Sequence, residues 1–208
     1  MHHGWIPHTK WPGDIVVVTI CLRVSYQLPY SSPVDGGTVR SGAEGKEVGI
    51  DIFACLHGAA LTKLLRAEQP VTLRMIETRP RDAWSAYLLN DAALLFVKYS
   101  TNRKQIRGGF SWYFTFGDSQ LEQISRSPHE VYVALVCGTE SLNDLKKGSC
   151  VCLLEPEELQ QMIDFQASVS QGVTVRWYPG KSLRVMREGR EMFKIPQNRL
   201  EKWQIPGA

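Results

Sequence analysis

The sequence of 208 residues lacks the short motifs that mark the commonest catalytic and nucleotide-binding sites. It has no G-x-G-x-x-G after a strand-like run, no G-x-S-x-G, no H-E-x-x-H and no calcium-binding loop. Gly45-Lys46 is followed by Glu47 and lacks the upstream glycine of a phosphate-binding loop. The five histidines are too dispersed to predict a metal triad. No motif therefore favours a small-molecule enzyme.

Long apolar runs and paired cysteines are also missing. The run from Ile15 to Leu22 is too short to cross about 30 Å of hydrocarbon, and it has neither the basic start nor the cleavage site of a signal peptide. The five cysteines are an odd number without C-x-x-C spacing, which indicates neither a disulfide framework nor a zinc site. We predict a reduced, cytoplasmic protein without a membrane partner.

The net charge is small, but the charged residues are unevenly distributed. A net charge of +3, with 43% hydrophobic and 22% charged residues, is typical of a soluble globular protein. Residues 173–208 carry eight Lys or Arg against three Glu, and the segment 92–117 has four basic residues and no acid. Clustered basic charge attracts phosphate, which favours DNA or RNA as a partner. The alternative is that each cluster is an ordinary solvated face.

The chain divides into an N-terminal extension and one main domain. Residues 1–45 contain a strand-like run at 14–24 and a connector rich in Pro and Gly, which is typical of a boundary. Tryptophans near the start make this arm the expected site of any homo-oligomer contact. Residues 46–208 are predicted to form a mixed α/β domain.

Hydrophobic periodicity predicts the elements of that domain. Helices are expected at 50–66, at 119–126 and from Pro156 onward; strands are expected at 71–76, 83–89, 92–99, 110–116, 131–136, 150–154, 173–178 and 182–187. Asn90-Asp91 is predicted to form a two-residue turn, because both residues tolerate positive φ. The order predicts an α/β or α+β fold in which helices flank one mixed sheet and a C-terminal β-hairpin follows.

One arrangement of residues points to a specific chemistry. Asp82 precedes one strand of a hairpin, and the partner strand 92–99 carries Lys98 and ends before Ser100-Thr101. With the preceding helix, the further strand 110–116, the following helix and the apolar strand 131–136, this layout resembles the PD-(D/E)xK nuclease superfamily of restriction-endonuclease-like fold. The resemblance covers about half the chain and concerns the order of elements more than individual residues.

The resemblance implies a carboxylate pair that binds Mg²⁺ beside a phosphodiester and a lysine that orients water. On that basis Asp82 and Lys98 are the candidate catalytic residues. The chain departs from the motif, because Phe96 stands where the second acid is expected. A metal site would then need Glu77, or else Glu47 or Asp51, beside Asp82.

Three interpretations of this region follow. In the first, Phe96 is a core residue and Lys98 is a strand-end lysine that reaches water. In the second, the fold is nuclease-like without catalysis. In the third, the protein is an active Mg²⁺-dependent nuclease whose acid has migrated.

Basic residues interleaved with aromatics suggest a binding surface. The candidate nucleic-acid contacts are Arg103, Lys104, Arg107, Arg176, Lys181 and Arg184. Such a composition suits nucleic-acid backbones and also protein interfaces. We therefore predict a nucleic-acid-associated protein with a degenerate nuclease centre; the alternative is a non-catalytic protein-interaction module or assembly subunit.

Overall fold

The computed structural model describes residues 17–18, 52–66, 71–79, 82–141, 148–167, 169–190 and 192–207. These residues form a mixed α+β fold with two β-sheets and few helices. Apart from Val17–Val18, the expected N-terminal extension at 1–45 lies outside the described residues. The domain boundary and the role of the arm in self-association therefore stay predictions.

The first sheet has six strands in the order β1-β2-β3-β4-β7-β8. These strands are β1 (Val17–Val18), β2 (Leu73–Arg79), β3 (Trp84–Leu89), β4 (Ala93–Ser100), β7 (Glu130–Cys137) and β8 (Cys150–Leu154). The sheet is mixed, because β7 runs parallel to β4 while the other neighbours are antiparallel. Every residue of β3 is buried, in keeping with a strand covered on both faces.

The second sheet has five antiparallel strands in the order β11-β10-β9-β6-β5. They are β5 (Arg103–Ile106), β6 (Gly109–Phe116), β9 (Gln171–Trp177), β10 (Leu183–Met186) and β11 (Phe193–Ile195). From Trp112 to the end of β6 burial alternates, with Trp112, Phe114 and Phe116 inside. One face of this sheet is therefore core, and the other face is free to carry polar side chains.

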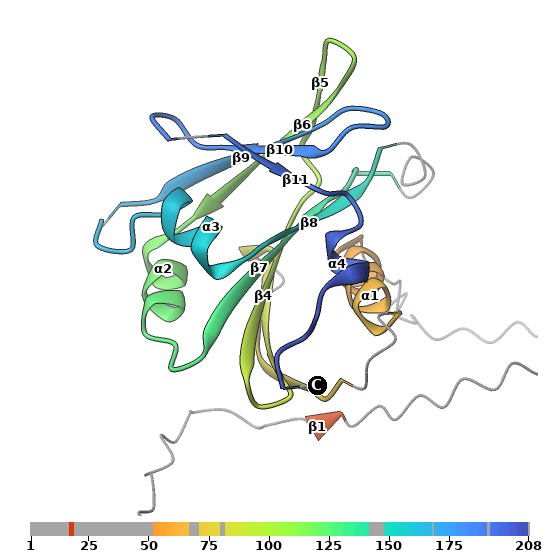
Figure 1. Cartoon of the computed structure of the whole chain (residues 1–208). Helices are drawn as coiled ribbons and strands as arrows, with labels where there is room; N and C mark the ends of the chain where they lie inside the picture. The colour runs from red at the N-terminus through yellow and green to blue at the C-terminus, as the bar shows by residue number, and fades with distance from the viewer. Residues whose placement is uncertain are drawn as a thin grey trace, which may run out of the picture.

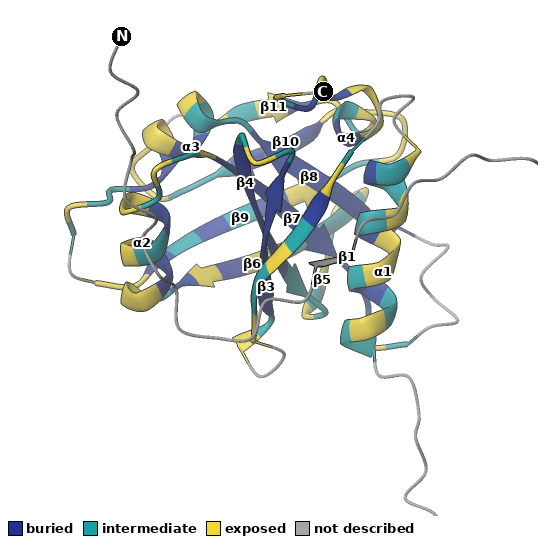
Figure 2. Ribbon diagram, turned by 90° about the horizontal axis from the view of Figure 1, so that it is seen from below, coloured by how far each residue is buried: buried dark blue, intermediate teal, exposed yellow. Residues whose placement is uncertain are grey.

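The two sheets pack face to face, and helices close the remaining sides (Figure 1). The main core lies between the sheets and includes residues of α2 (Asp118–Ser125) and α3 (Pro156–Met162). A second core lies on the other face of the first sheet, under α1 (Ile52–Leu65) and the C-terminal segment with α4 (Arg199–Lys202). Figure 2 shows the strands of the two sheets crossing, with buried residues concentrated in them.

The expected elements are present, but their assembly differs from the expectation. All the strands and helices expected between 50 and 187 appear within a few residues of their expected ends. The expectation of one sheet was wrong, because β6 leaves the first sheet and pairs with β9. The segment 100–109, between two expected strands, contains the additional strand β5, and β11 and α4 are also additional to the expected elements. The turn after β3 has the expected positive φ at Asn90 and Asp91 but also includes Ala92.

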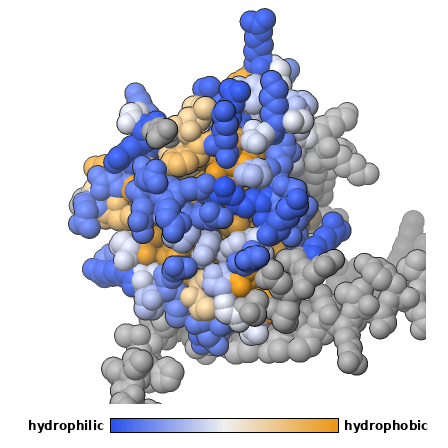
Figure 3. Space-filling model, in the orientation of Figure 1, coloured by the Kyte–Doolittle hydropathy of each residue, from blue (hydrophilic) through white to orange (hydrophobic). Residues whose placement is uncertain are grey.

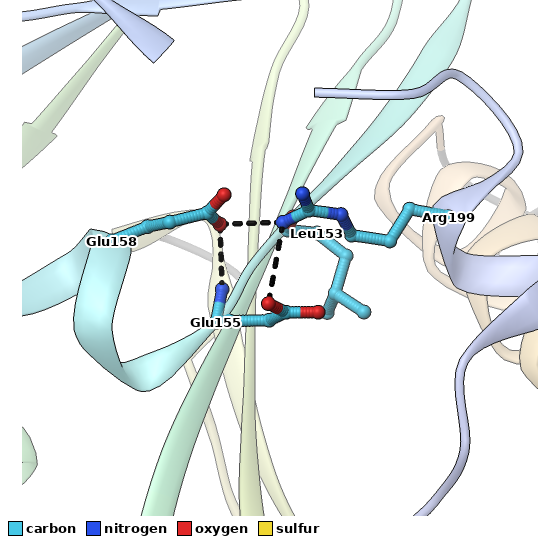
Figure 4. Close-up of polar contacts among 4 residues, drawn as sticks. All are labelled: Leu153, Glu155, Glu158 and Arg199. Atoms are coloured by element: carbon cyan, nitrogen blue, oxygen red, sulfur yellow. Dashed lines mark hydrogen bonds and ion pairs between the residues drawn. The ribbon is translucent and has the colours of Figure 1, made fainter. Parts of the chain in front are cut away.

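An ion pair fixes the C-terminal segment against the body of the fold (Figure 4). Arg199 Nη1 donates to Glu158 Oε2 at 2.5 Å and to the backbone oxygen of Leu153 at 3.4 Å. Glu155 Oε2 lies 3.9 Å from the same nitrogen. The side chains of Arg199 and Glu158 are only 19% and 16% exposed, so water screens this pair weakly.

We expect Arg199→Ala to lower the free energy of unfolding by about 2 kcal/mol, because it leaves Glu158 partly buried without its cation. The matched control is Lys63→Ala. Lys63 bonds Glu201 of α4 at 2.7 Å, but this pair is 38% and 42% exposed and should contribute less than about 1 kcal/mol. Urea unfolding of both variants measures the difference; equal losses would contradict this account.

Candidate functional site

A cavity of about 400 Å³ lies where β3 begins, β4 ends and α2 starts. The antiparallel register pairs Trp84 with Lys98, so the residue just before β3 and the last residues of β4 come to the same edge of the sheet. The residues lining this cavity are Asp82, Lys98, Tyr99, Ser100, Tyr113, Phe114, Thr115, Gly117, Ser119 and Gln120. The structure thus brings Asp82 and Lys98 to one cavity.

Lys98 is a charged side chain held almost out of water. It is 6% exposed, and side-chain alternation along β4 puts it on the same face as Phe96, toward the second sheet. Its ammonium donates to Gln120 Oε1 at 3.1 Å and to the backbone oxygen of Asp82 at 3.4 Å, and it lies 5.7 Å from the ring centre of Phe116. The interpretation that Lys98 reaches out to bulk water is therefore wrong.

Burial changes the acidity of this lysine. Desolvation lowers the pKa of Lys98 from 10.5 to about 8, and the charge of Asp82 opposes that shift only in part. No ion pair joins Lys98 to any carboxylate in the part of the chain that the structure describes. At neutral pH Lys98 is therefore protonated, and Asp82 is the acidic residue that lines the same cavity.

Asp82 sits beside Lys98 on strained backbone. It is exposed, and the next residue, Ala83, has a φ of +59°, in the left-handed region that residues other than glycine adopt rarely. The carbonyl of Ala83 accepts the backbone N–H of Tyr99 at 3.0 Å. This bond ties the segment with Asp82 to the end of β4.

Gln120 is the buried polar residue that the sequence reasoning missed. It is 6% exposed, and its Oε1 also accepts the backbone N–H of Gly117 at 3.3 Å. The available signal is the helical spacing, because Gln120 lies four residues before Ile124, a buried residue of the same helix. An uncharged oxygen thus occupies the place beside Lys98 where a carboxylate would have formed an ion pair.

The residues of this region do not fit the carboxylate pair that the resemblance implies. Phe96 is fully buried and stacks on Trp84 with ring centres 4.7 Å apart. Glu77 shares a neighbouring cavity of about 310 Å³ with Asp82, but its Oε1 accepts from Arg79 at 2.5 Å and its Oε2 from Gln123 at 3.2 Å. Among the described residues no three His, Cys, Asp or Glu side chains form a group that could hold a metal. Glu47 and Asp51 lie outside that part of the chain.

The six candidate nucleic-acid contacts all belong to the second sheet or its turns. Arg103 and Lys104 are in β5, and Arg107 follows in the turn to β6; Arg176 is in β9, Lys181 in the next turn, and Arg184 in β10. Because β6 pairs with β9, Phe110 lies opposite Trp177, and the turns with Arg107 and Lys181 come to the same end of the sheet. Two basic stretches that are distant in the sequence therefore form one surface.

Four basic side chains lie in register across this sheet. Lys104 is paired with Ser111, Ser111 with Arg176, Arg176 with Arg184, and Arg184 with Lys194. We call Lys104, Arg176, Arg184 and Lys194 the basic row. Within the described strands of this sheet there is no Asp or Glu. Like charges directly opposite each other destabilise a sheet, so folding alone does not account for the basic row.

The basic row lies on the outer face. Val175 and Val185, next to it in sequence, are fully buried, while Lys104, Arg176 and Lys194 are exposed. No ion pair involves the basic row in the described part of the chain, and Arg184 lies over the ring of Tyr178 at 5.0 Å. Figure 3 shows hydrophilic side chains projecting at the top of the view, where Figure 1 draws β5.

Comparison of the chain with protein-family models, with curated proteins and with solved structures gives no match. Among the described helices none is both long enough and apolar enough to span a membrane.

We expect Lys98→Met to raise the free energy of unfolding at pH 7 by on the order of 2 to 3 kcal/mol, because it removes a buried charge without breaking an ion pair. The gain should shrink as the pH rises from about 8 to 10.5. In that range the unfolded chain holds the Lys98 proton and the folded protein releases it, which stabilises the parent protein but not the variant.

Urea unfolding of the parent protein and of Lys98→Met, at pH 7 and at a pH near 10, measures the difference in the free energy of unfolding at each pH. Lys104→Met, at an exposed position, is the control and should change little at either pH. A destabilised Lys98→Met variant at pH 7, or a gain that does not depend on pH, would contradict the prediction.

Proposed function

We propose that this protein is a nucleic-acid-associated protein with a restriction-endonuclease-like core and a degenerate catalytic centre. In this proposal the second sheet binds the phosphodiester backbone, and Asp82 and Lys98 are the surviving positions of the former active site. Lys98 then binds a phosphate oxygen, and no metal-dependent step is part of the proposal.

The order of elements supports the nuclease-like part. Helix α1, the antiparallel strands β3 and β4, helix α2 and strand β7 come in the chain order that the resemblance implies, with β2 as an additional strand before β3. The further strand that the resemblance implies between the strand with Lys98 and α2 corresponds to β6, which belongs to the second sheet. Asp82 before β3 and Lys98 in β4 stand where the superfamily has its first acid and its lysine.

The degenerate part of the proposal follows from the donor atoms at the site. The position of the second acid is taken by Phe96, which is packed in the core, and the ammonium of Lys98 bonds the neutral oxygen of Gln120. A hard cation such as Mg²⁺ prefers carboxylate oxygens, and Glu77 already binds Arg79 and Gln123. The site is better suited to hold an anion against Lys98.

The observation that carries the proposal is the basic row. Its four cations lie on β5, β9, β10 and β11, with Ser111 of β6 between Lys104 and Arg176, so the row crosses five strands and extends about 19 Å at about 4.8 Å between strands. A phosphodiester strand is a polyanion of matching extended form, and its binding releases counterions. The same ligand relieves the repulsion between Arg176 and its cross-strand neighbour Arg184.

The double variant Arg176→Ala with Arg184→Ala tests this function. We expect the parent protein to bind labelled DNA or RNA at about 50 mM salt and to lose affinity steeply as salt rises. The variant should bind about tenfold more weakly, and its slope of log affinity against log salt should be smaller by about 1.4 to 1.8.

Arg66→Ala is the matched control. Arg66 is exposed at the end of α1, on the opposite side of the first sheet, and its removal should leave binding unchanged. Thermal unfolding checks that the double variant folds. Failure of the parent protein to bind either nucleic acid at low salt would overturn the proposal.

The catalytic part is tested separately by incubation of DNA and RNA with Mg²⁺ or Mn²⁺. We expect no cleavage that depends on Lys98, because the site lacks a second available carboxylate. The assay compares the parent protein with Lys98→Ala on gels. Cleavage that disappears in Lys98→Ala would contradict the degenerate centre and identify an active nuclease.

A further inference from the structure

Tyr113 is an exposed aromatic residue beside the basic row. It is 57% exposed, on the outer face of β6, two residues along the strand from Ser111. Residues two apart on a strand lie on one face, about 6.8 Å from each other. Tyr113 pairs with Thr174, and Thr174 with Met186, so a second, uncharged row runs parallel to the basic row.

The ring of Tyr113 rests on the neighbouring strand. A Cβ placed on Gly172 of β9 would overlap the phenol ring, so the ring occupies the space that a side chain at position 172 would fill. The overlap involves the hydroxyl oxygen, Cζ and Cε2, so the outer end of the ring lies over β9 while the residue as a whole is 57% exposed. Tyr113 is therefore an exposed aromatic ring that rests on the sheet at Gly172.

An aromatic surface next to a line of cations matches two chemical parts of an unpaired nucleic-acid strand. Bases stack on aromatic rings whatever their sequence, while phosphates bind Lys and Arg. A duplex hides the faces of its bases, and its major groove, about 12 Å wide, does not admit a row of about 19 Å on five strands. The combination favours single strands over duplexes.

We propose that the outer face of the sheet β11-β10-β9-β6-β5 binds single-stranded DNA or RNA, with the backbone along the basic row and a base stacked on Tyr113. This inference rests on the proposed function and specifies the class of its ligand. Tyr113 is also one of the residues that line the cavity of Lys98.

The test measures fluorescence anisotropy of labelled oligonucleotides of about 15 nucleotides, single-stranded and duplex, with the full chain. We expect the single strand to bind more tightly than the duplex. Tyr113→Ala should weaken single-strand binding by about 5- to 100-fold, and Tyr113→Phe should stay within about twofold of the parent, because the phenyl ring still stacks.

Two readouts separate stacking from charge. Tyr113→Ala should leave the dependence on salt unchanged, since it removes no cation, whereas loss of Arg176 lowers it. Gly172→Ala should also weaken single-strand binding, because the new methyl group displaces the ring. Tyr113 is exposed, so its replacement does not threaten folding.

The outcomes distinguish this inference from the function on which it rests. Duplex binding that equals single-strand binding and ignores Tyr113 would overturn the single-strand surface and leave a nucleic-acid-binding protein. Binding of neither probe would overturn both. Binding of polyglutamate as tight as that of the oligonucleotide, and indifferent to Tyr113, would identify the face as a surface for acidic polypeptides and would also overturn the inference.

Discussion

The antiparallel pairing of β6 with β9 forms the centre of the second sheet and fixes both its inner and its outer face. It aligns Phe110 to Phe116 with Trp177 to Gln171 over seven residue pairs. On the inner side, Trp112 and Phe114 enter the core with the valines of β9, and Trp112 Nε1 donates to the backbone oxygen of Gly138 at 2.7 Å. Burial of each such side chain contributes about 1.5 to 3 kcal/mol, while cross-strand repulsion between exposed charges costs less than about 1 kcal/mol. The core therefore sets the register of the strands, and this register brings the residues of the basic row opposite one another.

The same pairing places β6 near the end of β4 and so helps to enclose Lys98. Phe116 of β6 contributes its ring, and the chain continues directly into Gly117 and α2, which supplies Gln120. A lysine in that position has lost most of its hydration and has gained only neutral hydrogen-bond acceptors. Retention of a buried charge that is not in an ion pair lowers stability, and the charge of the nearby Asp82 offsets this cost only in part.

The sequence was sufficient to predict local structure and insufficient to predict which strands pair. Runs such as 131–136 and the alternation of 110–116 are decided by residues close in the chain, and the structure has strands there. The departure of β6 from the first sheet depends on its partner β9, more than fifty residues later, and no local pattern records that choice. For the same reason β5 went unnoticed, because its four residues RKQI carry no apolar alternation and form a strand only against β6.

For the candidate site, too, local contacts could be predicted from the sequence and long-range contacts could not. Asp82 and Lys98 could be brought together from the sequence, because a short turn joins their strands and fixes the register of the hairpin. The basic row could not be predicted in the same way. It brings a residue of β5 together with residues of β9 and β10, and β5 joins those strands only through the long-range pairing of β6 with β9. Two residues before Arg176 on the same strand, Thr174 pairs with Tyr113 in the uncharged row. Threonine is β-branched and favours strands, so a position on this face of the sheet does not need a cation to form the pairing. The other row carries Lys or Arg on four of its five strands, and the described strands hold no acid. The proposed function attributes this pattern to the binding of a polyanion.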